Sequence, residues 1–296
     1  MTIQPLPKII TDDLVKQALL EDLGLGGDLT SQATIDAETN AVYYMTARAD
    51  GILSGVQLAA DAFKMIDAEL SVNILKRDGA AIQKGDIVMA VKGRAVSILT
   101  AERVALNFLG RMCGIASLTA AMVAAAKPHS PLIACTRKTT PLLRAVEKYA
   151  VRCGGGATHR MRLDDAVMIK DNHIAANNGD IETTLKRARQ YAGHTVKIEI
   201  EVDNLTQFEE ICRVGIADII MLDNMSCDDM RQAVEINQGR FTLEASGNVN
   251  KDTIRDIAAT GVDVISVGAL THSAPNFDIG LDAAPQCAES RTSSIL

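Results

Sequence analysis

Two adjacent cations, Arg137 and Lys138, follow a short apolar run in the segment IACTRKTTP, residues 133–141. They belong to a basic stretch, residues 135–170, which holds eight Lys and Arg residues and three acidic ones, a local net charge of +5. The whole chain has a net charge of −7, so the remainder carries −12. A basic island in an acidic protein favours a small anionic ligand and argues against general nucleic-acid binding.

Polar residues recur wherever a predicted strand ends. Strand and helix patterns alternate after Pro131, which predicts a parallel sheet, either open or closed into a barrel. The ligand site of such a sheet lies at the carboxyl ends of its strands. We predict six strands, at 132–135, 166–169, 196–202, 217–222, 241–245 and 262–267. Between them we expect amphipathic helices near 141–152, which would begin at Pro141, and near 181–192, 205–214, 226–237 and 251–260.

The residues after these strands fall into three chemical groups. Cationic and hydroxyl side chains follow the first two strands: Thr136, Arg137, Lys138 and Lys170. Carboxylates belong to the third and fourth strands: Glu201 and Asp223. Small turns follow the last two: Ser246-Gly247-Asn248 and Gly268-Ala269. Scaffold requirements alone do not explain that order.

Each group suits a different part of one ligand. The cations, joined by His159 and Arg160 from the loop GGGATHR, would bind carboxylates. Glu201 and Asp223 could hold Mg²⁺ or accept hydrogen bonds from sugar hydroxyls. The small turns expose backbone N–H groups that suit a phosphate. The sequence therefore predicts a ligand with carboxylates at one end and a sugar phosphate at the other.

Several candidate residues have a simpler structural explanation. Arg144, Lys148 and Arg152 are spaced four apart, and we expect them to form a solvated helix face. His173 is more typical of a packing or capping residue than of a catalytic one. Of the alternating pair Glu199 and Glu201, we expect the second to reach the site because it lies nearer the strand end.

The first hundred residues indicate a mixed α+β domain. We expect a helix beginning at Thr11, a helix at 56–66 between strands at 41–49 and 70–76, and a long helix beginning at Thr100. Residues 78–93 resemble a biotinyl carrier hairpin around Lys92, but nothing marks a hairpin tip, so scaffold is the better interpretation.

Composition narrows the class of protein further. Apolar runs fall short of the roughly 18 residues of a membrane span, and the N-terminus lacks a signal-peptide pattern. The six cysteines show neither CxxC spacing nor a disulfide framework, which favours reduced thiols and a cytoplasmic protein.

Eight segments in order carry a resemblance to a known family: ERVALNFLGRMCGIAS, CTRKTTP, EKYAVRCGGGATHR, VMIKDNHI, IEIEVDN, DIIMLDN, LEASGNV and GVDVISVGAL. With EDLGLGGDLTS near the N-terminus, the chain resembles quinolinate phosphoribosyltransferase from about residue 10 to 270. The family makes nicotinate mononucleotide, pyrophosphate and CO₂ from quinolinate and phosphoribosyl pyrophosphate during NAD synthesis. The segment RVGIADIIM carries one more residue than the family pattern, which makes Glu201 a less direct match than Asp223.

The resemblance implies a fold and domain boundaries. The fold is an α/β sandwich domain at residues 1–112 beside an incomplete α/β barrel at 113–272. A tail at 273–296 is expected to pack back on the first domain. The family assembles as a head-to-tail homodimer, and a hexamer is also compatible.

Site roles follow from the same resemblance. Quinolinate would contact Arg137, His159, Arg160 and Lys170, with Lys138 close to both substrates and Thr136 beside them. Glu201 and Asp223 would lie at the ribose and Mg²⁺–pyrophosphate end, and Ser246–Asn248 with Val267–Ala269 would hold the 5′-phosphate. Arg103 would reach the site of a second subunit.

Three other functions stay open on the sequence alone. Relatives associated with molybdenum uptake share the architecture and could use another base. A barrel aldolase could use Lys170 as a Schiff-base lysine. A non-enzymatic anion-binding module would need only the basic stretch.

Overall fold

A computed structural model describes residues 3–283 of the chain, which divide into two compact units. The described part of unit 1 comprises residues 3–120, 140–155 and 274–283, and unit 2 comprises residues 121–139 and 156–273. The predicted boundary after residue 112 falls inside one continuous helix, α4 (Ala95–Ala125). The predicted boundary after residue 272 lies beside the start of the last segment of unit 1.

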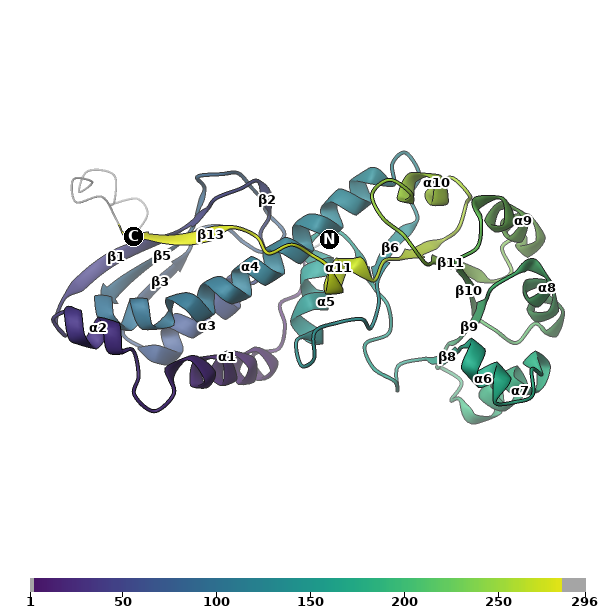
Figure 1. Cartoon of the computed structure of the whole chain (residues 1–296), viewed down its shortest axis with the longest axis horizontal. Helices are drawn as coiled ribbons and strands as arrows, with labels where there is room; N and C mark the ends of the chain where they lie inside the picture. Colours follow the sequence, from purple (N-terminus) through teal and green to yellow (C-terminus); the bar gives the residue numbers. More distant parts are fainter. Residues whose placement is uncertain (1–2, 284–296) are drawn as a thin grey trace. The chain divides into compact units, whose positions relative to one another are not determined.

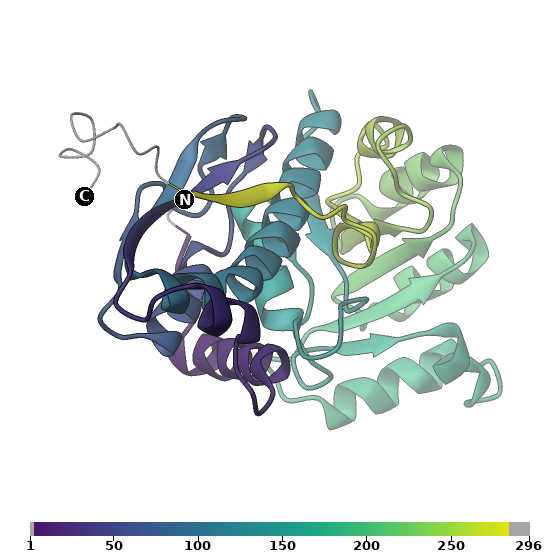
Figure 2. The same cartoon turned by 60° about the vertical axis from the view of Figure 1, so that its left-hand side comes forward.

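Unit 1 is built on a four-stranded antiparallel sheet in the order β13-β1-β5-β3. Its strands are β1 (Asn40–Ala47), β3 (Ser71–Ile74), β5 (Ile87–Arg94) and β13 (Ile279–Ala283). A short pair, β2 (Gly51–Ile52) with β4 (Ala81–Ile82), forms a separate two-stranded sheet. The last described strand, β13, drawn in yellow in Figure 2, pairs with β1 from the start of the chain.

The helices of unit 1 are α1 (Lys8–Leu23), α2 (Leu29–Thr34), α3 (Val56–Ile66), α4 and α5 (Arg144–Cys153). Helix α3 contacts α1 and β3 through buried apolar side chains that include Leu58 and Phe63. By length and composition, α4 would qualify as a membrane-spanning helix, but 56% of its most apolar 18-residue window is buried inside the protein. That burial is typical of a core helix in a soluble domain.

Unit 2 contains a seven-stranded parallel sheet in the order β7-β6-β12-β11-β10-β9-β8. The strands are β6 (Leu132–Cys135), β7 (Ala157–Thr158), β8 (Val167–Ile169), β9 (Ile198–Val202), β10 (Ile219–Asp223), β11 (Thr242–Ser246) and β12 (Val264–Ser266). Among the described residues no pairing joins β7 to β8, so the barrel is incomplete as predicted.

Helices cover the outer face of this sheet (Figure 1). They are α7 (Ile181–Tyr191), α8 (Leu205–Val214), α9 (Cys227–Asn237) and α10 (Ile254–Ala258). Two short helices, α6 (Asp171–Ala175) and α11 (Ala269–His272), follow the carboxyl ends of β8 and β12. Three start at side chains that accept a backbone N–H, namely Asp180, Asn204 and Ser226. These caps fix the point at which each strand-end loop becomes a helix.

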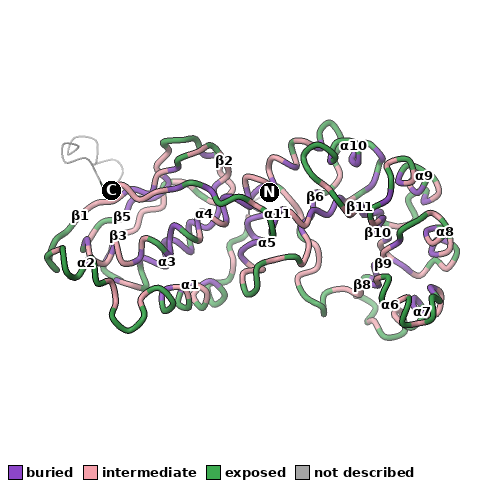
Figure 3. Tube along the Cα trace, viewed as in Figure 1, coloured by how far each residue is buried: buried purple, intermediate pink, exposed green. Residues whose placement is uncertain are grey.

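The strands of unit 2 alternate between the two faces of the sheet. On β9, Ile198, Ile200 and Val202 are buried, and α8 packs against this strand. Glu199 and Glu201 point to the opposite, inner face because strand side chains alternate. Figure 3 shows the strands largely buried and the outer turns of the helices exposed. The polar residues of the inner face therefore meet inside the half-barrel.

Four sequence predictions about helices were wrong. Helix α1 begins at Lys8, and the Thr11 hydroxyl donates to the Lys8 carbonyl instead of capping. Helix α4 begins at Ala95, and Thr100 likewise donates to Val96 O at 2.7 Å. Both threonines satisfy backbone carbonyls from inside a helix, a use that sequence alone does not separate from a cap.

The other two errors concern α5. It begins at Arg144, three residues after the expected start at Pro141. Its predicted solvated face is also wrong for one residue, because Lys148 is 1% exposed and only Arg152 of the three cations is exposed. Helix α5 therefore buries charged side chains, including Glu147, within unit 1.

Candidate active site

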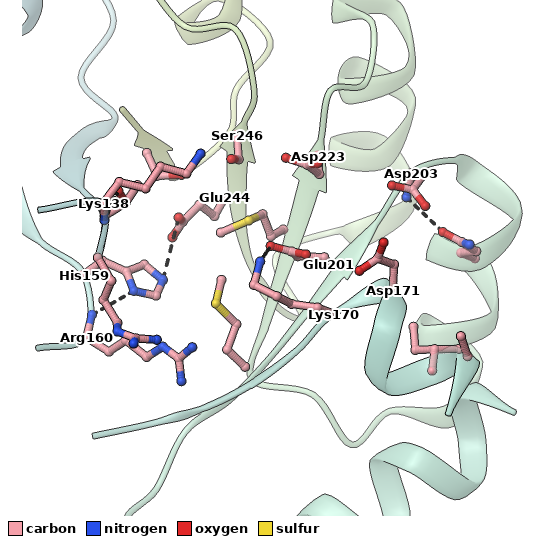
Figure 4. A pocket seen from close by; sticks show the side chains of 18 of the residues that line it. Lys138, His159, Arg160, Lys170, Asp171, Glu201, Asp203, Asp223, Glu244 and Ser246 are labelled. Carbon is pink, nitrogen blue, oxygen red and sulfur yellow. Dashed lines mark hydrogen bonds and ion pairs between the residues drawn. The ribbon is translucent and has the colours of Figure 1, made fainter. Parts of the chain in front are cut away.

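The carboxyl ends of the unit 2 strands surround a cavity of about 760 Å³ (Figure 4). Nine predicted site residues line it: Thr136, Arg137, Lys138, His159, Arg160, Lys170, Glu201, Asp223 and Ser246. They come from the ends of β6 to β11, six different strands. The structure thus brings together residues that are more than a hundred positions apart in the sequence.

Charge is distributed unevenly around the cavity. In Figure 4, Lys138, His159 and Arg160 lie on one side, and Asp223 lies on the other. Lys170 extends to Glu201 near the middle and forms an ion pair with it. A bound molecule would therefore meet cations at one end and the carboxylates of Glu201 and Asp223 toward the other, while Glu244 lies beside His159 on the cationic side.

The turn that carries Lys138 is fixed by backbone contacts. The Lys138 backbone N–H donates to Thr136 Oγ1 at 3.1 Å, and the Lys138 carbonyl accepts from Thr271 Oγ1 at 2.7 Å. A Cβ added to Gly268 would lie 3.2 Å from the Lys138 side chain, so the turn after β12 packs closely against this lysine. The position of the cation is therefore set by two strand ends.

Arg137 and Arg160 create a local excess of positive charge. Burial lowers the pKa of Arg160, and the neighbouring Arg137 charge lowers it further. The buried Nε of Arg137 has no hydrogen-bond partner among the described residues. Because a buried donor without a partner is costly, this end of the cavity favours an anion.

The His159 ring is held from both nitrogens. Its Nδ1 accepts the backbone N–H of Arg160 at 2.8 Å, so the ring proton lies on Nε2. Nε2 is 2.8 Å from Glu199 Oε2 and donates to it. Binding a substrate carboxylate through a ring N–H, the expected role of His159, would require one of these bonds to break.

Lys170 stands at the start of α6. Its side chain is 42% exposed, while that of its partner Glu201 is 15% exposed. The Lys170 backbone N–H donates to His173 Nδ1 at 3.0 Å. The interpretation of His173 as a capping residue is confirmed, and its bond fixes the direction in which Lys170 leaves the backbone.

The turns after β10 and β11 are tied together. Asn224 donates through its amide to Asp223 Oδ2 at 2.9 Å and through its backbone to Ser246 O at 2.9 Å. Asn248 donates to Asn224 Oδ1 at 3.2 Å. Gly247 has φ +98°, and a Cβ there would lie 2.1 Å from Asn224 Oδ1. Only glycine fits this turn without displacing Asn224.

Six predicted site residues do not line the cavity. Five belong to the small turns: Gly247, Asn248, Val267, Gly268 and Ala269. Val267 is 1% exposed, and its backbone N–H donates to the Ala134 carbonyl at 2.8 Å. The sixth, Arg103, is exposed on α4 in unit 1.

The sequence reasoning missed several lining residues, among them Met168, Gln207, Met221, Glu244 and Ser266. Glu244 is the one with an available signal, because it is the single charged residue of its strand. It aligns in register with Met221 of β10, which in turn aligns with Glu201 of β9. Glu244 and Glu201 therefore stand in one row across the inner face of the sheet.

Glu201 and Asp223 offer oxygen ligands from adjacent strands of one cavity. Mg²⁺ in phosphate-binding sites commonly uses one or two carboxylates, with waters and substrate phosphates completing the shell. The donor set therefore fits this ion. Ligand atoms of His159, Glu199 and Glu244 also lie within 4.8 Å of one another. The hydrogen bond from His159 to Glu199 occupies the nitrogen that a metal would need, so we do not assign a metal there.

Two family models match the chain. The model for the N-terminal domain of quinolinate phosphoribosyl transferase matches residues 28–113, and that for the C-terminal domain matches residues 115–282. The chain belongs to the quinolinate phosphoribosyltransferase family. The two matches meet near the predicted boundary at residue 112, and together they span both compact units.

Individual members of the family show the same similarity over most of their length. The chain is 41% identical over 269 residues to the probable nicotinate-nucleotide pyrophosphorylase [carboxylating] of Bacillus subtilis, covering 91% of this chain and 92% of that protein. It is 42% identical to the chloroplastic nicotinate-nucleotide pyrophosphorylase [carboxylating] of Arabidopsis thaliana, and the match covers 95% of this chain and 85% of that protein. The crystal structure of NadC from Streptococcus pyogenes matches this structure with a TM-score of 0.90 and 41% sequence identity. The match covers 95% of this chain and 100% of that chain.

Proposed function

We propose that this chain transfers the phosphoribosyl group of phosphoribosyl pyrophosphate to the ring nitrogen of quinolinate. Loss of CO₂ then gives nicotinate mononucleotide, as expected of a pentosyltransferase in NAD biosynthesis. The observation that carries the proposal is a single cavity with cations at one end and carboxylates at the other. Membership of the quinolinate phosphoribosyltransferase family supports the same pair of substrates.

The cationic end is the proposed site for the quinolinate dicarboxylate. Arg137 and Arg160 repel each other in the absence of an anion, so binding a carboxylate relieves that repulsion. Lys138 and Lys170 add point charges that orient the ring. Thr136 acts on the protein instead of the substrate, because its hydroxyl accepts the Lys138 N–H. These groups position the substrate, because a cation held tightly on the departing carboxylate would slow its loss.

The opposite end is the proposed site for the sugar phosphate and pyrophosphate. Breaking the bond between C1 and pyrophosphate develops positive charge on the ribose, which the carboxylates of Glu201 and Asp223 would stabilise. The turns Ser246–Asn248 and Val267–Ala269, which follow two neighbouring strands, are the proposed site for the 5′-phosphate. The Val267 N–H already donates to the Ala134 carbonyl, so the other backbone N–H groups would have to bind it. The tie between Asn224 and Gly247 holds one of those turns in place.

Mg²⁺ is the proposed cofactor, with Glu201 and Asp223 as its protein ligands. When bound, it would stabilise the negative charge of the departing pyrophosphate. Lys170 would need to release Glu201 for this to happen, and quinolinate offers the lysine an alternative anionic partner. Substrate binding and metal binding should therefore support each other.

A second subunit completes the proposed enzyme. Arg103 is exposed on α4 of unit 1 and does not line the cavity of unit 2. We propose that it enters the cavity of a partner copy in a homodimer and adds a further contact to the dicarboxylate. We also propose a cytoplasmic location, which the five free cysteines of the described residues support.

The test is loss of quinolinate that depends on phosphoribosyl pyrophosphate, measured with and without Mg²⁺. We expect equal amounts of pyrophosphate, CO₂ and nicotinate mononucleotide, and no turnover after chelation. Absence of turnover with every pyridine carboxylate tested would refute the proposal. Turnover of another pyridine carboxylate without CO₂ release would favour the relatives associated with molybdenum uptake.

Two other classes of function make different predictions. An aldolase needs a Lys170 amine that is free to attack a carbonyl carbon, whereas here the Lys170 side chain is paired with Glu201. Borohydride trapping of a carbonyl compound on Lys170 would support that class. An anion-binding module would bind ligand equally well after Glu201→Ala and Asp223→Ala and would never release pyrophosphate.

A further inference from the structure

Glu244 is a buried carboxyl group that faces the cavity and that the proposed chemistry has not used. It lies on β11, is 3% exposed and lines the cavity. Its Oε1 has no hydrogen-bond partner among the described residues. A buried carboxylate oxygen left in this state is costly, which favours the neutral carboxylic acid.

The neighbours of Glu244 favour the same protonation state. His159 Nε2 is 2.8 Å from Glu199 Oε2 but 3.8 Å from Glu244 Oε1, so the imidazole gives its proton to the other carboxylate. Glu199 and Glu201 add negative charge nearby, and together with burial they outweigh His159 and the Ser266 hydrogen bond, which act in the opposite direction. Burial, followed by the charge of Glu199, raises the pKa of Glu244 to about 7.

The substrate adds a further reason. A dianionic pyridine dicarboxylate would be repelled by an ionised Glu244 on the cavity wall, whereas a neutral acid would not repel it. The neutral acid also brings a proton to the cavity wall beside His159, whose own ring proton is donated to Glu199, and beside the apolar side chain of Met221.

We propose that Glu244 is a catalytic acid that supplies the proton which replaces CO₂ on the pyridine ring. This inference rests on the proposed function, because it assigns a residue to the second half of that reaction. After the ring nitrogen has been alkylated, the bond between the ring carbon and its carboxylate breaks. CO₂ leaves, and the electron pair stays on the carbon next to the cationic nitrogen.

The Glu244 carboxyl group then donates its proton to that carbon and becomes a carboxylate. No oxidant or reductant is needed, and solvent returns the proton when the product leaves. A carboxylic acid whose pKa is raised to about 7 by burial and nearby carboxylates keeps its proton in a large share of the molecules at neutral pH, which suits this role.

Glu244→Gln tests the proposal because the amide keeps the shape of the side chain but has no acidic proton. In single-turnover experiments with quinolinate, phosphoribosyl pyrophosphate and Mg²⁺, we expect pyrophosphate release to stay within a few-fold of wild type. Formation of nicotinate mononucleotide should fall by roughly 10²-fold or more. The dicarboxylated mononucleotide should accumulate and be detectable by mass spectrometry.

Glu244→Asp is the matched variant, because it keeps an acid at a slightly different reach. Nicotinate mononucleotide should form faster in Glu244→Asp than in Glu244→Gln. That difference would show that the loss in Glu244→Gln comes from the missing acid and not from misfolding. Equal slowing of pyrophosphate release and CO₂ release in Glu244→Gln, or no change in either, would overturn the proposal. Wild-type protein that releases no pyrophosphate would instead refute the proposed function, so the two failures are distinguishable.

Discussion

Arg111 on α4 and Glu147 on α5 form an ion pair in which Nη2 and Nε lie 2.7 and 3.0 Å from the same carboxylate oxygen. Glu147 is fully buried, and it also accepts the Thr140 N–H at 3.1 Å and the Thr140 hydroxyl at 2.8 Å. This carboxylate therefore anchors the start of the segment that leads into α5. The pair links two helices of unit 1 that are far apart in the sequence.

Replacing Glu147 by Ala should destabilise unit 1 strongly, because it leaves the Arg111 guanidinium without its partner in a mostly buried position. We expect a loss of about 3–5 kcal/mol in the free energy of unfolding, measured by urea denaturation. Glu235→Ala is the control, since Glu235 is an exposed carboxylate on α9 and should cost less than about 0.5 kcal/mol. Similar losses in both variants would contradict the anchoring role.

Arg137→Ala should impair substrate binding without affecting the fold. The side chain supplies charge at the cationic end of the cavity, so we expect the KM for quinolinate to rise at least tenfold or turnover to disappear. The melting temperature should change by no more than a few degrees. Arg213→Ala removes an exposed arginine from α8 in the same unit and should leave the kinetics unchanged. Wild-type kinetics in Arg137→Ala would remove this residue from the site.

Gly247→Ala should disturb the proposed phosphate turn through steric conflict. The added Cβ would lie 2.1 Å from Asn224 Oδ1 and 2.9 Å from its backbone nitrogen. We expect the KM for phosphoribosyl pyrophosphate to rise at least tenfold, with a smaller effect on the KM for quinolinate.

Gly239→Ala is a close control for this substitution. Gly239 also has a positive φ, +75°, but nothing lies within 4 Å of an added Cβ. It should therefore show only the backbone strain of about 1 kcal/mol and no change in KM. If both variants behave alike, strain rather than contact with Asn224 explains the effect.

The buried Glu244 should make stability depend on pH. Its pKa is raised to about 7, first by burial and then by Glu199, so the folded protein holds this proton at pH values where the unfolded chain has lost it. The stability linked to the proton is fully present below about pH 4.5 and is lost as the pH rises through about 7. Glu244→Gln has no such proton.

The measurement is the difference in melting temperature between Glu244→Gln and wild type. Between pH 5 and pH 8 the melting temperature of the wild type should fall by a few degrees relative to that of Glu244→Gln. Glu235→Gln, on an exposed side chain, should show no trend. A difference that stays constant across this range would mean that Glu244 is ionised throughout.

Much of unit 2 could be predicted from the sequence because its elements have strong signals. The helix expected near 205–214 coincides with α8, in which Asn204 caps the first turn and Gly215 ends the last. Strand β7 and helices α6 and α11 were missed, because two to five residues are too few for a periodic pattern.

The site was predictable where chemistry follows a strand end and less so elsewhere. Arg137, Lys170 and Asp223 end strands, so the rule for parallel sheets identified them. Glu244 lies within a strand, and its role depends on the neighbours that register provides. Lys148 was misjudged for a similar reason, because burial of a charged side chain depends on tertiary contacts that no spacing reveals.

The pairing of β1 with β13 has a consequence for biosynthesis. Tyr43 of β1 pairs with Ala283 of β13, which the ribosome adds 240 residues later, so this pairing cannot form until the end of synthesis. At 5–20 residues per second, that interval is roughly 12–50 seconds. Until then, one edge of β1 is unpaired and can pair with other nascent chains. A chaperone that covers β1 until the last strand emerges should therefore raise the yield of folded enzyme.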